Sequence, residues 1–338
     1  MSKNLSNFLF TSTMIMGTLI TISSNSWLGA WMGLEINLLS FIPLMMNLKN
    51  SISTESSLKY FLTQALASSI LLFSVIMLAL FSANLNNLNT NLLVNFILNF
   101  SILIKMGSAP FHFWFPEVME GLSWNMGLIL MTWQKIAPMI LLSYCISFNI
   151  IFMIIFFSIM IGSIGGINQT SLRKLMAYSS INHVGWLLSS MLISHNYWMI
   201  YFSFYTFLSS SIIFLFNKLN IFYLSQTYSI LNINPINKFM LFCNFLSLGG
   251  LPPFMGFFPK WMIIQALAYD NMFLITMMVI FTLITLFYYI RITYSAFLMN
   301  YTLNKWSFNT KIKFNMTFIM NFISTFGLIL IFIIYNML

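Results

Sequence analysis

The chain has 338 residues, of which 59% are hydrophobic and only 6% are charged, with 14 basic and 5 acidic side chains. A soluble globular protein carries about 25% charged residues, so this composition excludes a water-soluble fold, and its hydrophobicity excludes a disordered chain. The net charge of +9 is scattered singly along the chain, so we expect no nucleic-acid partner. A polytopic membrane protein remains.

Eleven apolar stretches are long enough to cross a bilayer, which takes about 20 residues. The connections between them are short and polar, so we expect no separate soluble domain. We predict an all-α polytopic membrane protein with about eleven transmembrane helices. In chain order the stretches are 8–24, 26–48, 58–82, 91–120, 125–145, 148–167, 172–192, 196–222, 237–269, 272–299 and 315–336.

The basic residues of the connecting loops all fall on one side of the predicted membrane. If the N-terminus lies on that side, ten loop Lys and Arg residues lie there and none lies opposite, as the positive-inside rule requires. We therefore expect the C-terminus on the other side. The ten residues are Lys3, Lys49, Lys59, Arg173, Lys174, Lys218, Lys238, Lys305, Lys311 and Lys313.

Four ionisable residues lie deep in the predicted spans: Glu35, Lys105, Lys135 and Lys260. An ionisable group at the bilayer centre costs about 2.5–3.5 kcal/mol on insertion scales. Snorkelling to the headgroups, or a purely structural ion pair, is the simpler alternative. A buried lysine suits proton transfer, because desolvation disfavours its charge and a nearby carboxylate favours it. We therefore predict a polar axis that carries protons.

Three spans contain residues that interrupt a helix, because proline lacks an N–H and glycine is conformationally permissive. In transporters such breaks mark water-filled cavities. Lys105 should cap the C-terminal end of its half-helix, where the dipole favours a cation. Lys260 lies two turns beyond its break, so the same dipole argument does not apply to it. The predicted break residues are Gly107, Pro110, Pro138, Gly249, Gly250, Pro252 and Pro253.

The two Gly/Pro breaks are five spans apart, which predicts an internal repeat. Residues 1–146 would form one five-helix unit and 147–300 a second. Five is an odd number, so the second unit would be inverted, and the fourth helix of each would be discontinuous. Residues 301–338 would add one C-terminal helix.

Other polar residues and motifs carry weaker signals. His112 and His183 are candidates for relaying protons, with a structural hydrogen bond as the alternative. Cys145 and Cys243 fall at opposite ends of their spans and form no metal or haem motif, so we expect no disulfide and no cofactor in this chain. The segment GSIGG at 162–166 has no strand before it, so it favours close helix approach over dinucleotide binding.

Three segments closely resemble signatures of the antiporter-like subunits of respiratory complex I. They are KMGSAPFHFWFPEVMEG at 105–121, LRKLMAYSSINHVGW at 172–186 and LGGLPPFMGFFPKW at 248–261. The resemblance runs over most of the chain. The abundance of Phe (37) and Met (27), residues with A/T-rich codons, looks like an animal mitochondrial member.

The resemblance implies two inverted five-helix units and a proton axis at Glu35, Lys105, Lys135 and Lys260. It implies that FMN, Fe–S clusters and ubiquinone are bound by other subunits. The partners would be the other membrane-arm subunits, including a neighbouring antiporter-like subunit, and lipids such as cardiolipin. The location would be the mitochondrial inner membrane, with the N-terminus in the matrix and the C-terminus in the intermembrane space. A cation/proton antiporter subunit and a purely structural scaffold remain alternatives.

Overall fold

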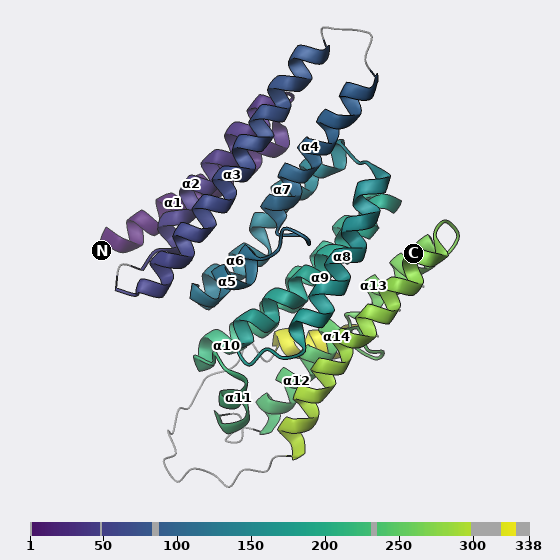
Figure 1. The fold of residues 1–338 in the computed structure, drawn as a ribbon. Coiled ribbons are helices and arrows are strands. Elements are labelled where there is room, and N and C mark those ends of the chain that lie inside the picture. Colours follow the sequence, from purple (N-terminus) through teal and green to yellow (C-terminus); the bar gives the residue numbers. More distant parts are fainter. Residues whose placement is uncertain (1, 48, 83–87, 231–234, 299–318, 329–338) are drawn as a thin grey trace. The chain divides into compact units, whose positions relative to one another are not determined.

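A computed structural model describes residues 2–47, 49–82, 88–230, 235–298 and 319–328 (Figure 1). Within these ranges the regular structure is helical, apart from one isolated antiparallel bridge between Ser171 and Tyr223. Seven of the described helices are long and apolar enough to cross a membrane. The chain is therefore an all-helical protein with several candidate membrane spans, as its composition predicts.

The chain divides into two compact units, Met1–Ile154 and Ile155–Leu338. The predicted boundary at residue 146 stays a prediction. The helices of the first unit are α1 (Ser2–Ser23), α2 (Trp27–Met45), α3 (Ser51–Ser82), α4 (Leu88–Met106), α5 (Trp114–Gly121), α6 (Trp124–Met131) and α7 (Trp133–Tyr144).

Helix α8 (Phe148–Gly166) begins in the first unit and ends in the second. The second unit continues with α9 (Leu172–Ile193), α10 (His195–Leu219), α11 (Leu224–Ile230), α12 (Pro235–Gly249), α13 (Phe257–Leu267) and α14 (Met272–Leu298). A further apolar helix, Ile319–Leu328, is called the C-terminal helix below.

The helix bounds can be compared with the predicted spans and connections within the described residues. The predicted connection 223–236 contains α11, which the sequence analysis did not predict. Six of the ten basic residues predicted to lie in loops fall inside helices: Lys3 in α1, Lys59 in α3, Arg173 and Lys174 in α9, Lys218 in α10 and Lys238 in α12. Of the predicted span 315–336, only 319–328 falls within the described residues.

Helices α1 and α2 pack through their backbones. A Cβ atom added to Gly33 would lie 2.8 Å from the Gly17 carbonyl oxygen, and one added to Gly17 would lie 2.9 Å from the Asn37 nitrogen. Small residues allow such close approach between membrane helices. This contact fixes the position of α2, which carries Glu35 and Asn37.

The first two helices of the second unit also pack through glycine. A Cβ atom on Gly162 of α8 would lie 2.6 Å from the Asn182 nitrogen of α9. The prediction that GSIGG permits close helix approach is therefore confirmed. Cys145 and Cys243 are both free cysteines.

Candidate functional site

The first helix break is a glycine cap at the end of α4. Gly107 has φ +68°, and the Ser108 nitrogen donates to the Leu103 carbonyl at 3.3 Å. This backward hydrogen bond across a left-handed glycine is the Schellman helix end. A cis peptide bond joins Ala109 and Pro110, and the chain enters α5 at Trp114.

The carbonyl groups released by this break are satisfied by side chains from the protein. The indole Nε1 of Trp114 donates to the Ile104 oxygen at 3.2 Å, and Gln64 of α3 donates to the Lys105 oxygen at 3.4 Å. Carbonyls opened inside a membrane need such partners. Lys105 itself lies in the last turn of α4, at the negative end of the helix dipole.

The second break repeats this backbone pattern at the end of α12. Gly250 has φ +83°, and the Leu251 nitrogen donates to the Leu246 carbonyl at 3.3 Å. The peptide bond between Pro252 and Pro253 is cis. A Cβ atom on Gly250 would lie 2.8 Å from Cδ of Lys260, so a larger residue here would displace that side chain.

Lys260 belongs to α13, but its ammonium group contacts the C-terminal end of α12. The prediction that the helix dipole has no effect on Lys260 is therefore wrong. Its Nζ donates to the Gly249 oxygen at 2.8 Å and to the Leu248 oxygen at 3.1 Å. The chain turns back after the break, so a residue of α13 reaches the last carbonyls of α12. Sequence distance placed Lys260 two turns away from this break, whereas the fold places it at the negative end of the α12 dipole.

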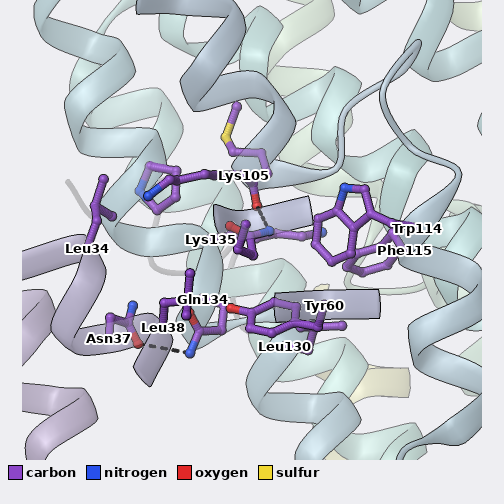
Figure 2. Close-up of a pocket in the computed structure, with 13 residues that line it drawn as sticks. Leu34, Asn37, Leu38, Tyr60, Lys105, Trp114, Phe115, Leu130, Gln134 and Lys135 are labelled. Atoms are coloured by element: carbon purple, nitrogen blue, oxygen red, sulfur yellow. Dashed lines mark hydrogen bonds between the residues drawn. The ribbon is translucent and has the colours of Figure 1, made fainter. Parts of the chain in front are cut away.

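Lys105 and Lys135 line one small cavity in the first unit (Figure 2). Both are buried, and the Lys135 side chain is among the least exposed charged groups at 2%. The cavity volume is about 20 Å³, more than the roughly 10–15 Å³ that one water molecule needs. Polar atoms of Asn37, Gln134 and other side chains border it. The remaining lining residues are Leu34, Leu38, Tyr60, Gln64, Met106, Trp114, Phe115, Leu130 and Pro138.

Lys135 follows a helix interruption that the sequence analysis misplaced. Helix α6 ends at Met131 and α7 begins at Trp133, with Thr132 between them at φ −112° and ψ −71°. Pro138, predicted as the break, lies inside α7. Lys135 is therefore in the first turn of α7, and its Nζ lies 5.3 Å from the ring centre of Phe115.

Glu35 acts on Lys105 without contacting it. The carboxylate interacts electrostatically with Lys105, while the two ion pairs formed among the described residues are both at Lys59. Glu35 Oε1 is buried and has no hydrogen-bond partner in the described part of the chain. Glu35 is not among the residues that line the cavity.

The two candidate histidines have different surroundings. His112 Nδ1 lies 3.2 Å from the Pro110 oxygen, and its ring packs on Phe113 at 4.4 Å. His183 Nδ1 forms a 2.8 Å hydrogen bond with the Tyr201 hydroxyl. Each histidine therefore has a hydrogen-bond partner within the chain, and the relay role stays a prediction for both.

An aromatic pair links the surroundings of His183 to those of Lys260 in the second unit. The ring of Tyr201 stacks on Trp186, with 6.4 Å between centroids and 7° between planes. Lys260 Nζ lies 5.9 Å from the ring centre of Trp186. His183 and Lys260 thus border the same aromatic cluster on α9, α10 and α13.

The uncharged polar residues of the site were not predicted from the sequence. Gln134 Nε2 donates to Asn37 Oδ1 at 2.9 Å, and Gln64 holds the carbonyl of Lys105. The available signal was an amide side chain within an apolar span, which needs a buried partner. Sequence does not show which partner each amide selects.

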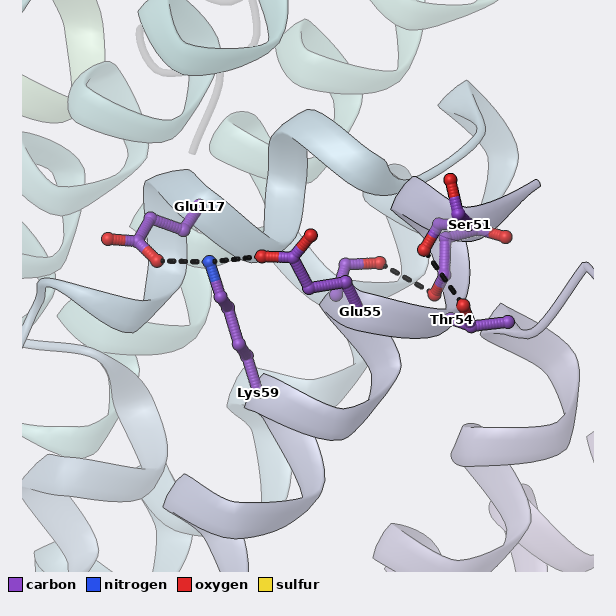
Figure 3. A network of polar contacts seen from close by, with 7 residues as sticks. Ser51, Thr54, Glu55, Lys59 and Glu117 are labelled. Carbon is purple, nitrogen blue, oxygen red and sulfur yellow. Dashed lines mark hydrogen bonds and ion pairs between the residues drawn. The ribbon is translucent and has the colours of Figure 1, made fainter.

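A cluster of charged residues connects α3 to α5 at the exposed end of the first broken span. Lys59 lies 2.8 Å from Glu117 and 3.0 Å from Glu55, as Figure 3 shows. All three side chains are 43–66% exposed. Exposed pairs of this kind contribute about 0–1 kcal/mol each, so this cluster orients α5 more than it stabilises the fold.

Comparison with known proteins adds an independent observation. Residues 24–285 match the family described as NADH:quinone oxidoreductase/Mrp antiporter, TM. The chain is 57% identical to NADH-ubiquinone oxidoreductase chain 2 of Anopheles gambiae, over 98% of this chain and 99% of that protein. It is 47% identical to the Locusta migratoria protein of the same name, over 97% of each.

Two solved structures share the fold. Respiratory complex I from Thermus thermophilus contains a chain that superposes with a TM-score of 0.78 at 21% identity, covering 86% of this chain and 70% of that one. The Mrp complex from Dietzia contains another, with a TM-score of 0.75 at 16% identity, covering 85% of this chain and 59% of that one. At these identities the likeness concerns the fold alone.

Proposed function

The chain belongs to the NADH-ubiquinone oxidoreductase chain 2 family of antiporter-like membrane proteins, and from that premise we propose that it carries part of a proton path. It acts as a membrane-arm subunit of the proton-pumping NADH:ubiquinone oxidoreductase. Flavin, Fe–S clusters and ubiquinone are bound by other subunits, and this chain converts the energy released there into proton movement.

The cavity shared by Lys105 and Lys135 is the observation that carries this proposal. Two buried lysine side chains border one space of about 20 Å³, which is large enough for one water molecule. Proton transfer requires the two groups to be within hydrogen-bond reach, directly or through one water. A scaffold has no use for two buried, like-charged groups around one space, because each adds a desolvation cost.

Glu35 controls the proton on Lys105 in this proposal. A carboxylate nearby favours the charged lysine, and its withdrawal favours release of the proton. The absence of a direct ion pair suits this role, because a contact pair would hold the proton on Lys105 more firmly. Lys260 has the corresponding role in the second unit, where backbone carbonyls hold it in place of a carboxylate.

The two breaks support a two-unit architecture with eleven membrane crossings. Gly107 and Gly250 both have a positive φ, and each is followed three residues later by a cis proline, Pro110 and Pro253. The dipeptides Phe115-Pro116 and Phe258-Pro259 also lie at equal distances after these two glycines. Two five-helix units in inverted orientation, followed by the C-terminal helix, account for this correspondence.

The surroundings of the chain follow from the same proposal. It is a multi-pass protein of the mitochondrial inner membrane, with the N-terminus in the matrix and the C-terminus in the intermembrane space. Its neighbours are other membrane-arm subunits, including an antiporter-like one, and lipids such as cardiolipin. A proton path within the chain argues against a purely structural scaffold. The relatives named NADH-ubiquinone oxidoreductase chain 2 match nearly the whole length of the chain, which favours a subunit of this complex over a subunit of a separate antiporter.

Substitution within the intact complex tests the proposed function. Lys105→Met and Glu35→Gln are each expected to lower the number of protons translocated per NADH oxidised more than they lower assembly. Their effects should not add, because both act through one coupling. Lys49→Met removes an exposed lysine and is the matched control. An unchanged proton ratio in a fully assembled Lys105→Met complex would show that the chain is a scaffold.

A further inference from the structure

Buried polar side chains join the C-terminal helix to α12 near the second break. Asn244 Nδ2 donates to Asn321 Oδ1 at 2.7 Å, and the Ser324 hydroxyl donates to Asn244 Oδ1. Asn244 and Ser324 are 0% exposed, and Asn321 is 3% exposed. In Figure 1 the C-terminal helix is the short yellow segment. The proton path described above uses none of these three residues.

The same helix holds the loop that follows the break. The Met255 nitrogen donates to the Ser324 carbonyl at 3.4 Å. On its other side the loop lies against α12, since a Cβ atom on Gly256 would be 1.8 Å from the Ser247 oxygen. The loop 250–256 is therefore held between α12 and the C-terminal helix, and both contacts involve backbone atoms.

These contacts bear on Lys260 through the geometry of α12. Asn244 lies one helical turn before Leu248, whose carbonyl and that of Gly249 accept hydrogen bonds from Lys260. A helix end fixed by a buried amide pair has little freedom to slide or rotate, because each amide would lose its partner in an apolar environment. The amide pair thus determines where the two carbonyls meet the ammonium group.

We propose that the C-terminal helix is a positioning element for Lys260, acting through Asn321 and Ser324. It holds Asn244 and the loop 250–256 so that the end of α12 stays open and its last two carbonyls face the lysine. This inference rests on the proposed function, because it assumes that Lys260 belongs to the proton path.

Four variants of the intact complex in sealed vesicles test this proposal. Asn321→Leu leaves Asn244 without its acceptor, and Lys260→Met removes the lysine. The third variant combines both substitutions. Thr325→Val is the matched control, because the Thr325 hydroxyl bonds only to carbonyls of its own helix. The measurement is the number of protons translocated per NADH oxidised, normalised to the amount of assembled complex.

We expect Asn321→Leu to lower this proton ratio, Thr325→Val to leave it unchanged, and the double variant to match Lys260→Met alone, because both changes act at one site. An additive loss in the double variant, or an unchanged ratio for Asn321→Leu, overturns the positioning role. If Lys260→Met leaves the ratio unchanged, the proposed function of Lys260 fails instead, and the positioning role fails with it.

A further variant, Ser324→Ala, covers the case in which the Asn321→Leu complex does not assemble. Ser324→Ala removes one hydroxyl and leaves the Met255 hydrogen bond in place, since that bond uses the Ser324 carbonyl. It should lower the proton ratio by the same mechanism, to a smaller extent than Lys260→Met. A normal ratio in this assembled variant contradicts the proposal.

Discussion

The Gln134 side chain donates a 2.9 Å hydrogen bond to Asn37 Oδ1, which ties the helix that carries Glu35 to the helix that carries Lys135. The two residues are far apart in sequence and lie at the edge of the cavity that Lys105 and Lys135 share. The pair therefore connects the proposed proton-controlling carboxylate with the proposed proton acceptor.

Removing one member of this pair should cost more than removing both. Asn37→Leu leaves the Gln134 amide without its acceptor, and a buried group that loses its partner costs about 1–3 kcal/mol. The double variant with Gln134→Leu removes both polar groups and should recover part of that loss. Thermal unfolding of the purified complex measures the effect. Equal, additive losses would show that the amides do not interact.

Lys135→Met should separate stability from pumping. A methionine occupies a similar volume without a buried charge, so assembly is expected to be equal or better, since a charge at the bilayer centre costs about 2.5–3.5 kcal/mol. The proton ratio should fall, because the cavity then has one proton acceptor fewer. Quantifying assembled complex beside proton translocation checks both. Poor assembly with a normal ratio would indicate a structural lysine.

Two neighbouring glycines provide a matched comparison at the second break. Gly250→Ala forces a side chain into φ +83°, which costs about 1–2 kcal/mol, and its Cβ would collide with Lys260. Gly249→Ala is in ordinary contact, with its nearest atom at 3.5 Å. We expect loss of stability and of pumping for the first variant only. Thermal unfolding and the proton ratio are measured for both variants, and the adjacent positions make them a matched pair. Similar losses in Gly249→Ala and Gly250→Ala would contradict this prediction.

The charged cluster at Lys59 should contribute little to stability. Lys59→Met removes two exposed ion pairs, each of which is expected to contribute about 0–1 kcal/mol to the free energy of unfolding. The effect should shrink at high salt, because exposed charges are screened. Unfolding at two ionic strengths tests this. A large, salt-independent loss would mean that the cluster is buried against another subunit.

The membrane orientation has its own test. The ten-to-none distribution of these Lys and Arg residues between the two predicted sides of the membrane predicts that an epitope tag at the N-terminus is accessible only from the matrix side. Protease digestion of intact and of inverted inner-membrane vesicles distinguishes the two sides. Cleavage of the tag from the intermembrane-space side would reverse the proposed orientation.

Local sequence chemistry predicted the helix breaks at residues 107–110 and 249–253, because glycine and proline act on their own backbone. It did not predict the interruption at Thr132, which contains neither residue type. It placed Lys260 away from its break, because the turn after Gly250 is a tertiary feature. The positions of Lys105, Lys135 and Lys260 within apolar stretches predicted that they are buried, but not which groups they contact.

The same limit applies to the amides of the site. An asparagine or glutamine in an apolar span predicts that the amide has a buried hydrogen-bond partner. Which residue is that partner depends on the packing of helices that are far apart in sequence. Asn37 meets Gln134 because α2 is held in place by backbone contact with α1, and Asn244 meets Asn321, which lies 77 residues later in the chain. Short helices at surfaces, such as α11, carry too few residues for a periodic signal.

The contact between Gly17 and Gly33 has a consequence for inheritance. Every missense change in either codon adds at least a Cβ atom, and the available space is already taken by the carbonyl and amide atoms of the opposite helix. We therefore expect nucleotide variants at these two codons within a population to be almost entirely synonymous. When a missense variant does arise at one of these codons, we expect it to stay at a low fraction of the gene copies in an individual. The reason is that the added side chain would displace α2 and, with it, the carboxylate of Glu35.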